Sequence, residues 1–299
     1  MRSPTQRDLV VSDVIGLVPD AVDAAELSGG EFAAVWRVDL ADGRSVVLKV
    51  GPPEDVRVLT YERGLLAAEA EYFRLVRSNV PSAPVPEVLL TGDGWLVTTL
   101  LPGRPLTETP DDAGVRTQLG VAVAALHTVT GPHFGFIGDR PAAADWPTAF
   151  AAIIDSLRAD AAAWDVPLPP LAGLVDRHES ALKLVTRPAL VHLDLWDGNV
   201  LSEAGRLTGL VDGERFLYGD PLVDLVSPAL FHRIEDEPDH PFLRGYGGTL
   251  DDAARTRLGL YRVFLYVLMI AEIPSRGGAV GNPRYTYLTG LLEDELSRL

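Results

Sequence analysis

The segment from Val191 to Asn199 constrains this chain most, because it opens a series of polar residues at fixed spacing. Asp194 lies five positions before Asn199, and Asp212 follows thirteen positions after Asn199. A carboxylate, an amide and a second carboxylate in this order have to be brought to one place by the fold if they act together. The residues between them therefore matter as much as the three side chains.

Those intervening residues predict a short β-hairpin. Ala204-Gly205 is typical of a tight turn, and the apolar runs Val200-Leu201 and Leu207-Val211 on either side of it are typical of strands. A hairpin of this size can bring Asn199 and Asp212 together. We therefore expect both to lie beside the loop that contains Asp194.

These residue types suit phosphoryl transfer, in which the protein orients a hydroxyl and neutralises phosphate charge. We expect Asp194 to act as the base, and Asn199 and Asp212 to supply oxygen ligands to Mg²⁺ beside ATP. The spacing is similar to the H-R-D-x-x-x-x-N motif of protein kinases, but Leu193 replaces the Arg, which points away from control by a phosphorylated loop. His192 is expected either to brace the loop or to contact the substrate.

An isolated H-x-D-x-x-x-x-N pattern is more often an ordinary loop than a catalytic site. Lysine usage supplies a second signal, because only two of the 26 basic residues are lysine, and one of them, Lys49, lies in the β-branched run Ser45–Val50. A compact point charge suits phosphate oxygens, whereas the alternative is a strand-edge Lys that limits aggregation. Glu69, on an Ala/Leu-rich helix, is its expected ion-pair partner, with Glu62 and Glu71 as rivals.

Two further segments are candidates for nucleotide contacts. Gly29-Gly30 separates two predicted strands, where backbone amides can approach phosphate oxygens, although a plain β-turn is the alternative because the full G-x-G-x-x-G pattern is missing. Trp95–Gly103 predicts a strand that runs into a linker. In a kinase-like arrangement its backbone, at Thr98, Thr99 and Leu100, would meet the adenine ring.

The order of these parts resembles the aminoglycoside phosphotransferase and choline kinase superfamily over nearly the whole chain. The resemblance is carried by the lysine strand, the helix glutamate, Leu101-Pro102-Gly103, Leu126-His127, the H-x-D-x-x-x-x-N motif, Val211-Asp212-Gly213-Glu214 and Gly219–Leu225. The Asp194-Leu195-Trp196-x-Gly198-Asn199 run is similar to fructosamine kinases and to actinobacterial glucosamine kinases, and Asp212–Phe216 is most similar to the latter. Gly213 departs from the family, in which this middle residue is usually large or aromatic.

The resemblance implies an α+β, protein-kinase-like fold of two lobes. Residues 1–100 would form a small N-terminal nucleotide-binding lobe with an antiparallel sheet and one helix, and residues 101–299 a larger, mostly helical lobe for catalysis and acceptor binding. In the second lobe, apolar periodicity predicts helices over 115–129, 146–164, 171–185, 220–230, 250–272 and 285–299. Asp220 and Asp224 are expected to be structural, as a helix cap and as braces of the catalytic loop, the segment from Val191 to Asn199 that contains Asp194.

Composition is compatible with this assignment. A chain of 32.2 kDa with 47% hydrophobic residues can bury a sizeable core, and the absence of cysteine excludes disulfides and thiol chemistry. The net charge of −16 argues against a nucleic-acid partner and favours a small cationic acceptor. The N-terminus lacks a signal pattern, and the apolar run 258–271 is too short for a membrane span, so we expect a cytoplasmic protein with no membrane partner.

The resemblance implies an ATP- and Mg²⁺-dependent kinase of an amino sugar, with conversion of D-glucosamine to glucosamine 6-phosphate as the leading activity. An aminoglycoside antibiotic kinase or a fructosamine-type kinase is the nearest alternative, because each shares the catalytic residues. A nucleotide-binding pseudokinase is an alternative of another class, although a module without catalysis has no need for Asp194.

Recognition of the acceptor depends on a few side chains of the same segment. Glu214 lies two residues after Asp212, so on an extended strand both carboxylates would face one side and Glu214 would reach a substrate amine. The alternative is that Glu214 orients the metal loop, Val211-Asp212-Gly213-Glu214, or pairs with Arg215. Trp196 is expected to stack on a sugar face or to pack against the helical lobe. Glu272 is a further candidate for a cationic pocket.

Overall fold

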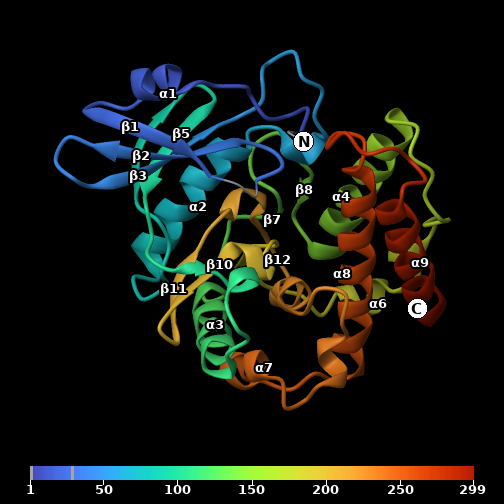
Figure 1. Cartoon of the computed structure of the whole chain (residues 1–299). Coiled ribbons are helices and arrows are strands. Elements are labelled where there is room, and N and C mark those ends of the chain that lie inside the picture. Colours follow the sequence, from blue (N-terminus) through green and yellow to red (C-terminus); the bar gives the residue numbers. More distant parts are fainter. Residues whose placement is uncertain (1–2, 28–29) are drawn as a thin grey trace.

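The N-terminal lobe is built on a five-stranded antiparallel sheet, at the upper left of Figure 1. The structure, a computed structural model of the chain, describes residues 3–27 and 30–299. The strand order is β1-β2-β3-β5-β4, with β1 (Ala21–Glu26), β2 (Ala34–Leu40), β3 (Ser45–Val50), β4 (Val88–Gly92) and β5 (Trp95–Thr99). The strand expected at Trp95 and the lysine strand are both present.

Two helices cover opposite faces of this sheet. Helix α1 (Val11–Leu17) packs through Val14 against the face that carries Leu48 and Trp36. Because side chains alternate along a strand, Lys49 of β3 points to the other face, where α2 (Leu65–Asn79) lies. The order of residues in β3 thus directs the one lysine of the lobe toward this helix.

Helix α2 buries one stripe of its surface. Glycine at the N-cap, Gly64, has a φ of 70°, which suits a residue without Cβ, and the Ala/Leu-rich run after it favours helix. Glu69, Tyr72 and Val76 recur at helical spacing on the stripe and are each 0% exposed. A fully buried carboxylate on an otherwise apolar stripe requires a partner.

The larger lobe is mostly helical, as predicted. Its α-helices are α3 (Ala113–Leu126), α4 (Trp146–Ala163), α5 (Leu174–Arg177), α6 (Glu179–Leu182), α7 (Pro241–Tyr246), α8 (Asp252–Ala271) and α9 (Pro283–Arg298). Its short strands are β6 (Arg104–Pro105), β7 (Phe134–Gly135), β8 (Ala142–Ala143), β9 (Ala189–Val191), β10 (Val200–Glu203), β11 (Arg206–Leu210) and β12 (Leu217–Gly219). The 3-10 turns of the chain are Thr60–Glu62, Leu106–Glu108, Asp197–Asn199, Gly213–Arg215, Pro221–Leu225, Ser227–Ala229 and Ile234–Asp236. The antiparallel sheet and the helical lobe confirm the expected protein-kinase-like fold (Figure 1).

Two of the predicted helices are not continuous α-helices in the structure. The segment 171–185 contains two one-turn helices, α5 and α6, and the first begins only after Gly173, which has a φ of 68°. The segment 220–230 contains two 3-10 turns, because Pro228 has no amide to donate to the Asp224 carbonyl and continue an α-helix. Both predictions rested on a helical period of apolar residues, and segments that form only short helical turns can show the same period.

Two small sheets join the segments that carry the polar residues. Strands β10 and β11 form the predicted hairpin, and its turn residues Ala204 and Gly205 have φ angles of 48° and 72°, as a tight turn of this hand requires. In the second sheet, Val191 of β9 pairs with Leu217 of β12. The catalytic loop therefore begins beside the end of the segment that follows Asp212.

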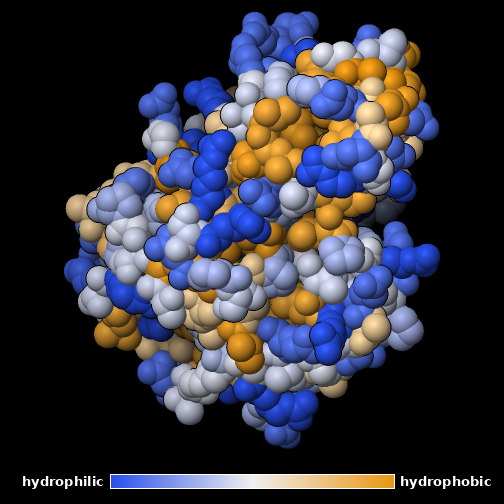
Figure 2. Space-filling model, turned by 90° about the vertical axis from the view of Figure 1, so that its left-hand side faces the viewer, coloured by the Kyte–Doolittle hydropathy of each residue, from blue (hydrophilic) through white to orange (hydrophobic). Residues whose placement is uncertain are grey.

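The surface of the N-terminal lobe has an apolar region. Figure 2 shows hydrophobic side chains gathered on the upper part of one face, where this lobe lies. Exposed apolar residues of the lobe include Val22, Leu89 and Leu90. Across the described part of the chain, no helix combines the length and apolar character needed to cross a membrane.

Candidate active site

The backbone of the catalytic loop is held by one carboxylate. Asp224 accepts hydrogen bonds from the amides of His192 (2.8 Å) and Leu193 (2.7 Å), and it also bonds Nε2 of His127 (3.1 Å). Leu193 has a φ of 75°, a strained value for a branched residue, so the loop needs such a clamp. Asp224 is thus a structural brace, as expected. Asp220 is structural too: it caps the amide of Leu222 and accepts hydrogen bonds from Arg257 and the hydroxyl of Tyr261.

His192 is a brace and has no free nitrogen for a substrate. Its Nε2 donates to the carbonyl of Val211 (3.1 Å), and its Nδ1 accepts from the amide of Asp194 (3.3 Å). The side chain is 0% exposed, and burial lowers the pKa of the imidazole, which keeps it neutral. These two backbone contacts favour the expected brace over a contact with substrate.

The hairpin brings the three predicted catalytic positions together. Nδ2 of Asn199 donates to the carbonyl (2.9 Å) and the carboxylate (3.2 Å) of Asp194, and the amide of Val211 donates to the carbonyl of Asn199 (3.0 Å). Asp212 follows Val211 directly. With its amide nitrogen committed, Asn199 keeps its side-chain oxygen for a cation.

Lys49 joins this group from the other lobe. Its Nζ donates to Glu69 at 2.6 Å and also to the carboxylate of Asp212. Burial acts to lower the pKa of Lys49, but the charges of Asp212 and Glu69 outweigh it and raise the pKa. The expected ion pair with Glu69 is confirmed, whereas the rival Glu62 bonds Arg276 instead.

Glu214 is buried among charged groups that include Lys49 and Arg215, and it does not lie on the extended strand assumed for an amine contact. Residues 213–215 form a 3-10 turn, so Glu214 and Asp212 do not alternate as on an extended strand. Glu214 is 9% exposed; burial raises the pKa of its carboxyl to about 8, against the lowering effect of Lys49. A largely protonated carboxyl near neutral pH is a poor partner for an ammonium group.

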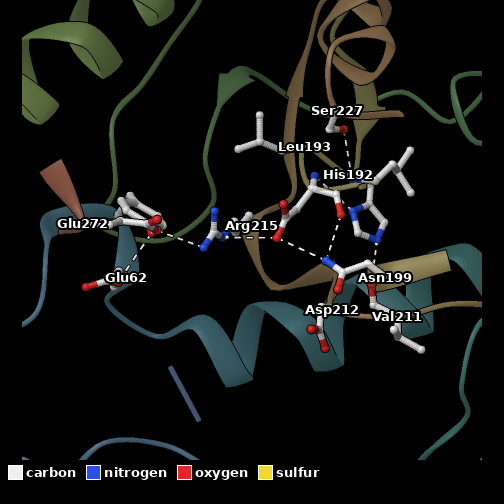
Figure 3. Close-up of polar contacts among 12 residues, drawn as sticks. Glu62, His192, Leu193, Asn199, Val211, Asp212, Arg215, Ser227 and Glu272 are labelled. Carbon is white, nitrogen blue, oxygen red and sulfur yellow. Dashed lines mark hydrogen bonds and ion pairs between the residues drawn. The ribbon is translucent and has the colours of Figure 1, made fainter. Parts of the chain in front are cut away.

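Arg215 lies at the site, although the sequence suggested it only as a possible partner of Glu214. Figure 3 shows its guanidinium between Glu272 and the catalytic loop, with Nη2 at 2.9 Å from Glu272 and Nε at 3.7 Å from Asp194. Burial raises the pKa of the Asp194 carboxyl, and Arg215 opposes that shift. The only signal in the sequence was its place three residues after Asp212.

Glu272 takes part in a charged network instead of a free cationic pocket. It accepts from Arg215, as Figure 3 shows. It also bonds the hydroxyl of Tyr61 and, at 3.4 Å, Arg276, which in turn bonds Glu62. Burial acts to raise the pKa of Glu272, but Arg215 and Arg276 lower it overall. The network connects the N-terminal lobe, the loop after Asp212 and the end of α8.

The residues predicted to contact the nucleotide differ in their exposure and in the hydrogen bonds that they already make. Gly29 lies outside the described residues, and the carbonyl of Gly30 accepts from Gln6 (2.7 Å). Thr98 and Thr99 lie within β5, and Thr99 bonds the backbone of Glu87 through both its amide and its hydroxyl. Leu100 follows the strand and is 40% exposed. Of the described positions among these, Leu100 is the most exposed residue.

Trp196 is an exposed residue of the larger lobe. Its ring covers Gly198, where a Cβ would lie 2.2 Å from the indole, and it is 38% exposed. Together with Asp197, Arg116 and Glu237 it lines a cavity of about 470 Å³. Asp197 forms a two-bond pair with Arg116 at 2.6 and 2.8 Å, whereas Glu237 contributes an exposed carboxylate.

The donor set of Asn199 and Asp212 fits Mg²⁺. Both present oxygen, and the Asp212 carboxylate is 38% exposed; burial acts to raise its pKa, but Lys49 lowers it and keeps the group ionised. Residues 3–27 and 30–299 contain no cluster of three or more His, Cys, Asp or Glu side chains arranged for a metal. Two protein ligands suit a cation that completes its shell with water and phosphate oxygens.

Known proteins show the same architecture. The chain is 26% identical over 230 residues to a protein named probable ketoamine kinase from Lactiplantibacillus plantarum, which covers 71% of this chain and 75% of that protein. A crystal structure of a protein named as a fructosamine-3-kinase from Thermobifida fusca has a TM-score of 0.67 and 25% identity, and the match covers 96% and 98% of the two chains. The aminoglycoside phosphotransferase APH(4)-Ia in complex with ADP and hygromycin B also has a TM-score of 0.67, at 19% identity, with the same coverage.

A family model covers most of the chain, including Lys49, the catalytic loop and the metal loop. The model of the phosphotransferase enzyme family, APH, matches residues 23–261. This match extends from β1 into α8. The chain belongs to the phosphotransferase enzyme family.

Proposed function

We propose that this protein is an ATP- and Mg²⁺-dependent kinase that phosphorylates a hydroxyl of a sugar carrying an amine. The leading acceptor is D-glucosamine, with glucosamine 6-phosphate as product. The observation that carries the proposal is one group of residues. Asn199 bonds Asp194, Lys49 bonds both Glu69 and Asp212, and the amide of Val211, next to Asp212, donates to the carbonyl of Asn199. This group contains the base, the oxygen donors and the phosphate cation that the transfer needs.

Each residue has a distinct part in the proposed reaction. Asp194 accepts the hydrogen of the acceptor hydroxyl as its oxygen attacks the terminal phosphorus of ATP and the bond to ADP breaks. Asn199 and Asp212 would hold Mg²⁺, which neutralises phosphate charge when bound. Lys49, oriented by Glu69, contacts the phosphates, and Leu100 offers its backbone to the adenine.

The cavity beside Trp196 is the proposed acceptor side. The exposed face of the indole suits the apolar face of a sugar ring. Glu237 supplies an exposed carboxylate in the same cavity, whereas Asp197 is already paired with Arg116. We therefore assign the amine contact to Glu237 in preference to Glu214, which is buried.

A ketoamine, the fructosamine class of acceptor, is the second candidate. The similarity to the relatives named ketoamine kinase and fructosamine-3-kinase favours it. Both candidates are small sugars with a basic nitrogen near the ring, and both fit a chain with a net charge of −16. They differ in the size of the group on that nitrogen.

An ADP-release assay across a matched acceptor panel tests the proposal. The panel contains glucosamine, glucose, N-acetylglucosamine, a fructosamine and a kanamycin-type antibiotic. We expect glucosamine to exceed glucose by about ten- to hundred-fold in kcat/KM, the effect of one charged hydrogen bond of roughly 1.5 to 3 kcal/mol. Glu237→Gln should remove most of this preference, and Glu214→Gln is the matched control that should keep it.

The possible results distinguish the candidate functions from one another. Preference for the fructosamine selects the second candidate, and preference for the antibiotic selects an aminoglycoside kinase. Equal rates on glucose and glucosamine would remove the proposed amine contact. Absence of ADP release with every acceptor, while MgADP still binds, would support a nucleotide-binding pseudokinase.

A further inference from the structure

Gly213 is a glycine for reasons of space and not of backbone conformation. It lies between Asp212 and Glu214 on the metal loop, and its φ is not positive, so any residue can adopt its backbone. A Cβ built there would lie 2.1 Å from Cδ1 and 2.6 Å from Cε1 of Tyr72. No side chain fits at position 213 while the Tyr72 ring is present.

The Tyr72 ring is fixed from several sides. It packs edge-on against the His192 ring, with centroids 5.2 Å apart, and lies 5.6 Å from the Phe216 ring. The side chain is fully buried, yet its hydroxyl has no hydrogen-bond partner among the described residues. The ring itself, and not the hydroxyl, therefore makes the contacts at this position.

Tyr72 and Glu69 belong to the same turn of α2. Residues three apart on a helix share a face, so the helix that presents Glu69 to Lys49 also presents Tyr72 to the metal loop. Figure 3 shows Asp212 lying beside this helix. A shift of the Tyr72 ring would thus move the metal loop relative to the Lys49 and Glu69 pair.

We propose that Tyr72 is a positioning residue that fills from α2 the space left by the missing side chain of Gly213, and so fixes Asp212 against the Lys49 and Glu69 pair. This inference rests on the proposed kinase function. It predicts that positions 72 and 213 are coupled: volume is tolerated at one only when it is removed from the other.

A reciprocal substitution tests the coupling. Gly213→Ala in the wild-type background should lower kcat/KM for MgATP by about ten-fold or more, because the loop must move by a fraction of an ångström or more. Tyr72→Leu should cause a loss of similar size. In the Tyr72→Leu background, Gly213→Ala should restore activity several-fold. Tyr72→Phe is the control that keeps the ring and should retain wild-type turnover.

The readouts distinguish this inference from a merely structural role and from failure of the proposed function. Thermal melting and MgADP affinity are measured for all variants, and the coupling should appear in the MgADP affinity even if no acceptor is turned over. Absence of turnover in the wild type overturns the proposed function, whereas coupled MgADP affinities still support the positioning role. Additive losses in folded variants, with no rescue in the double variant, would overturn the inference. Loss of activity in Tyr72→Phe would also overturn it, because the hydroxyl would then be required.

Discussion

Nε of Arg215 lies 3.7 Å from Oδ2 of Asp194, which gives the proposed catalytic base a guanidinium neighbour that is always charged. Leu193, in the position of the protein-kinase Arg, cannot supply such a charge. The positive charge reaches the base from the segment after the metal loop instead. Through Glu272, the same guanidinium connects the base to α8.

Arg215→Met should lower both activity and stability. The substitution removes the cation beside Asp194 and leaves the buried Glu272 with Arg276 as its ion-pair partner. Breaking a buried ion pair costs about 3 to 5 kcal/mol when no second partner shares the charge. We expect a fall in kcat of about ten-fold or more and a clear fall in Tm. Steady-state kinetics and thermal melting check this. Arg298→Met, which removes an exposed guanidinium of the same lobe, should leave both unchanged.

Asp194→Asn should separate binding from catalysis. An amide has nearly the shape of the carboxylate but cannot take up the hydroxyl hydrogen, so turnover should fall by about a hundred- to ten-thousand-fold. The dissociation constant of MgADP, followed by titration, should change little because Lys49 and Asp212 remain. Near-normal turnover would eliminate Asp194 as the base.

Asp224→Ala should destabilise the protein through the catalytic loop. Two buried amides, of His192 and Leu193, would lose their acceptor, at a cost of about 1 to 3 kcal/mol each. We expect a lower midpoint of denaturant unfolding and loss of turnover. The matched control is Asp239→Ala at an exposed position of the same lobe. An unchanged midpoint would contradict the role of Asp224 as the clamp.

Glu214→Gln should alter how stability depends on pH. Folding raises the pKa of this carboxyl from 4.5 to about 8, so the folded form is favoured below pH 4.5 and this advantage is lost as the pH rises toward 8. The substitution should therefore raise Tm more at pH 8 than at pH 5 in the ligand-free protein. Glu203→Gln, at an exposed position, should show no such difference. Equal shifts at both pH values would contradict the raised pKa.

Several parts of the candidate site were predictable from the local spacing of residues. The alternation in β3 directs Lys49 toward α2, helical spacing places Glu69 on the buried stripe, and the Ala204-Gly205 turn closes the hairpin that joins Asn199 to Asp212. These features follow from strand and helix periods and from turn chemistry, which act over a few residues.

The contacts between distant segments were not predictable from local patterns and became visible in the folded protein. Arg215 meets Asp194 and Glu272 because β9 pairs with β12, and Gly213 is explained only by the Tyr72 ring from a helix 141 positions earlier. The burial of His192 and Glu214 was also apparent only in the folded structure. Such contacts depend on how whole helices and strands pack against one another, and local sequence patterns do not predict that packing.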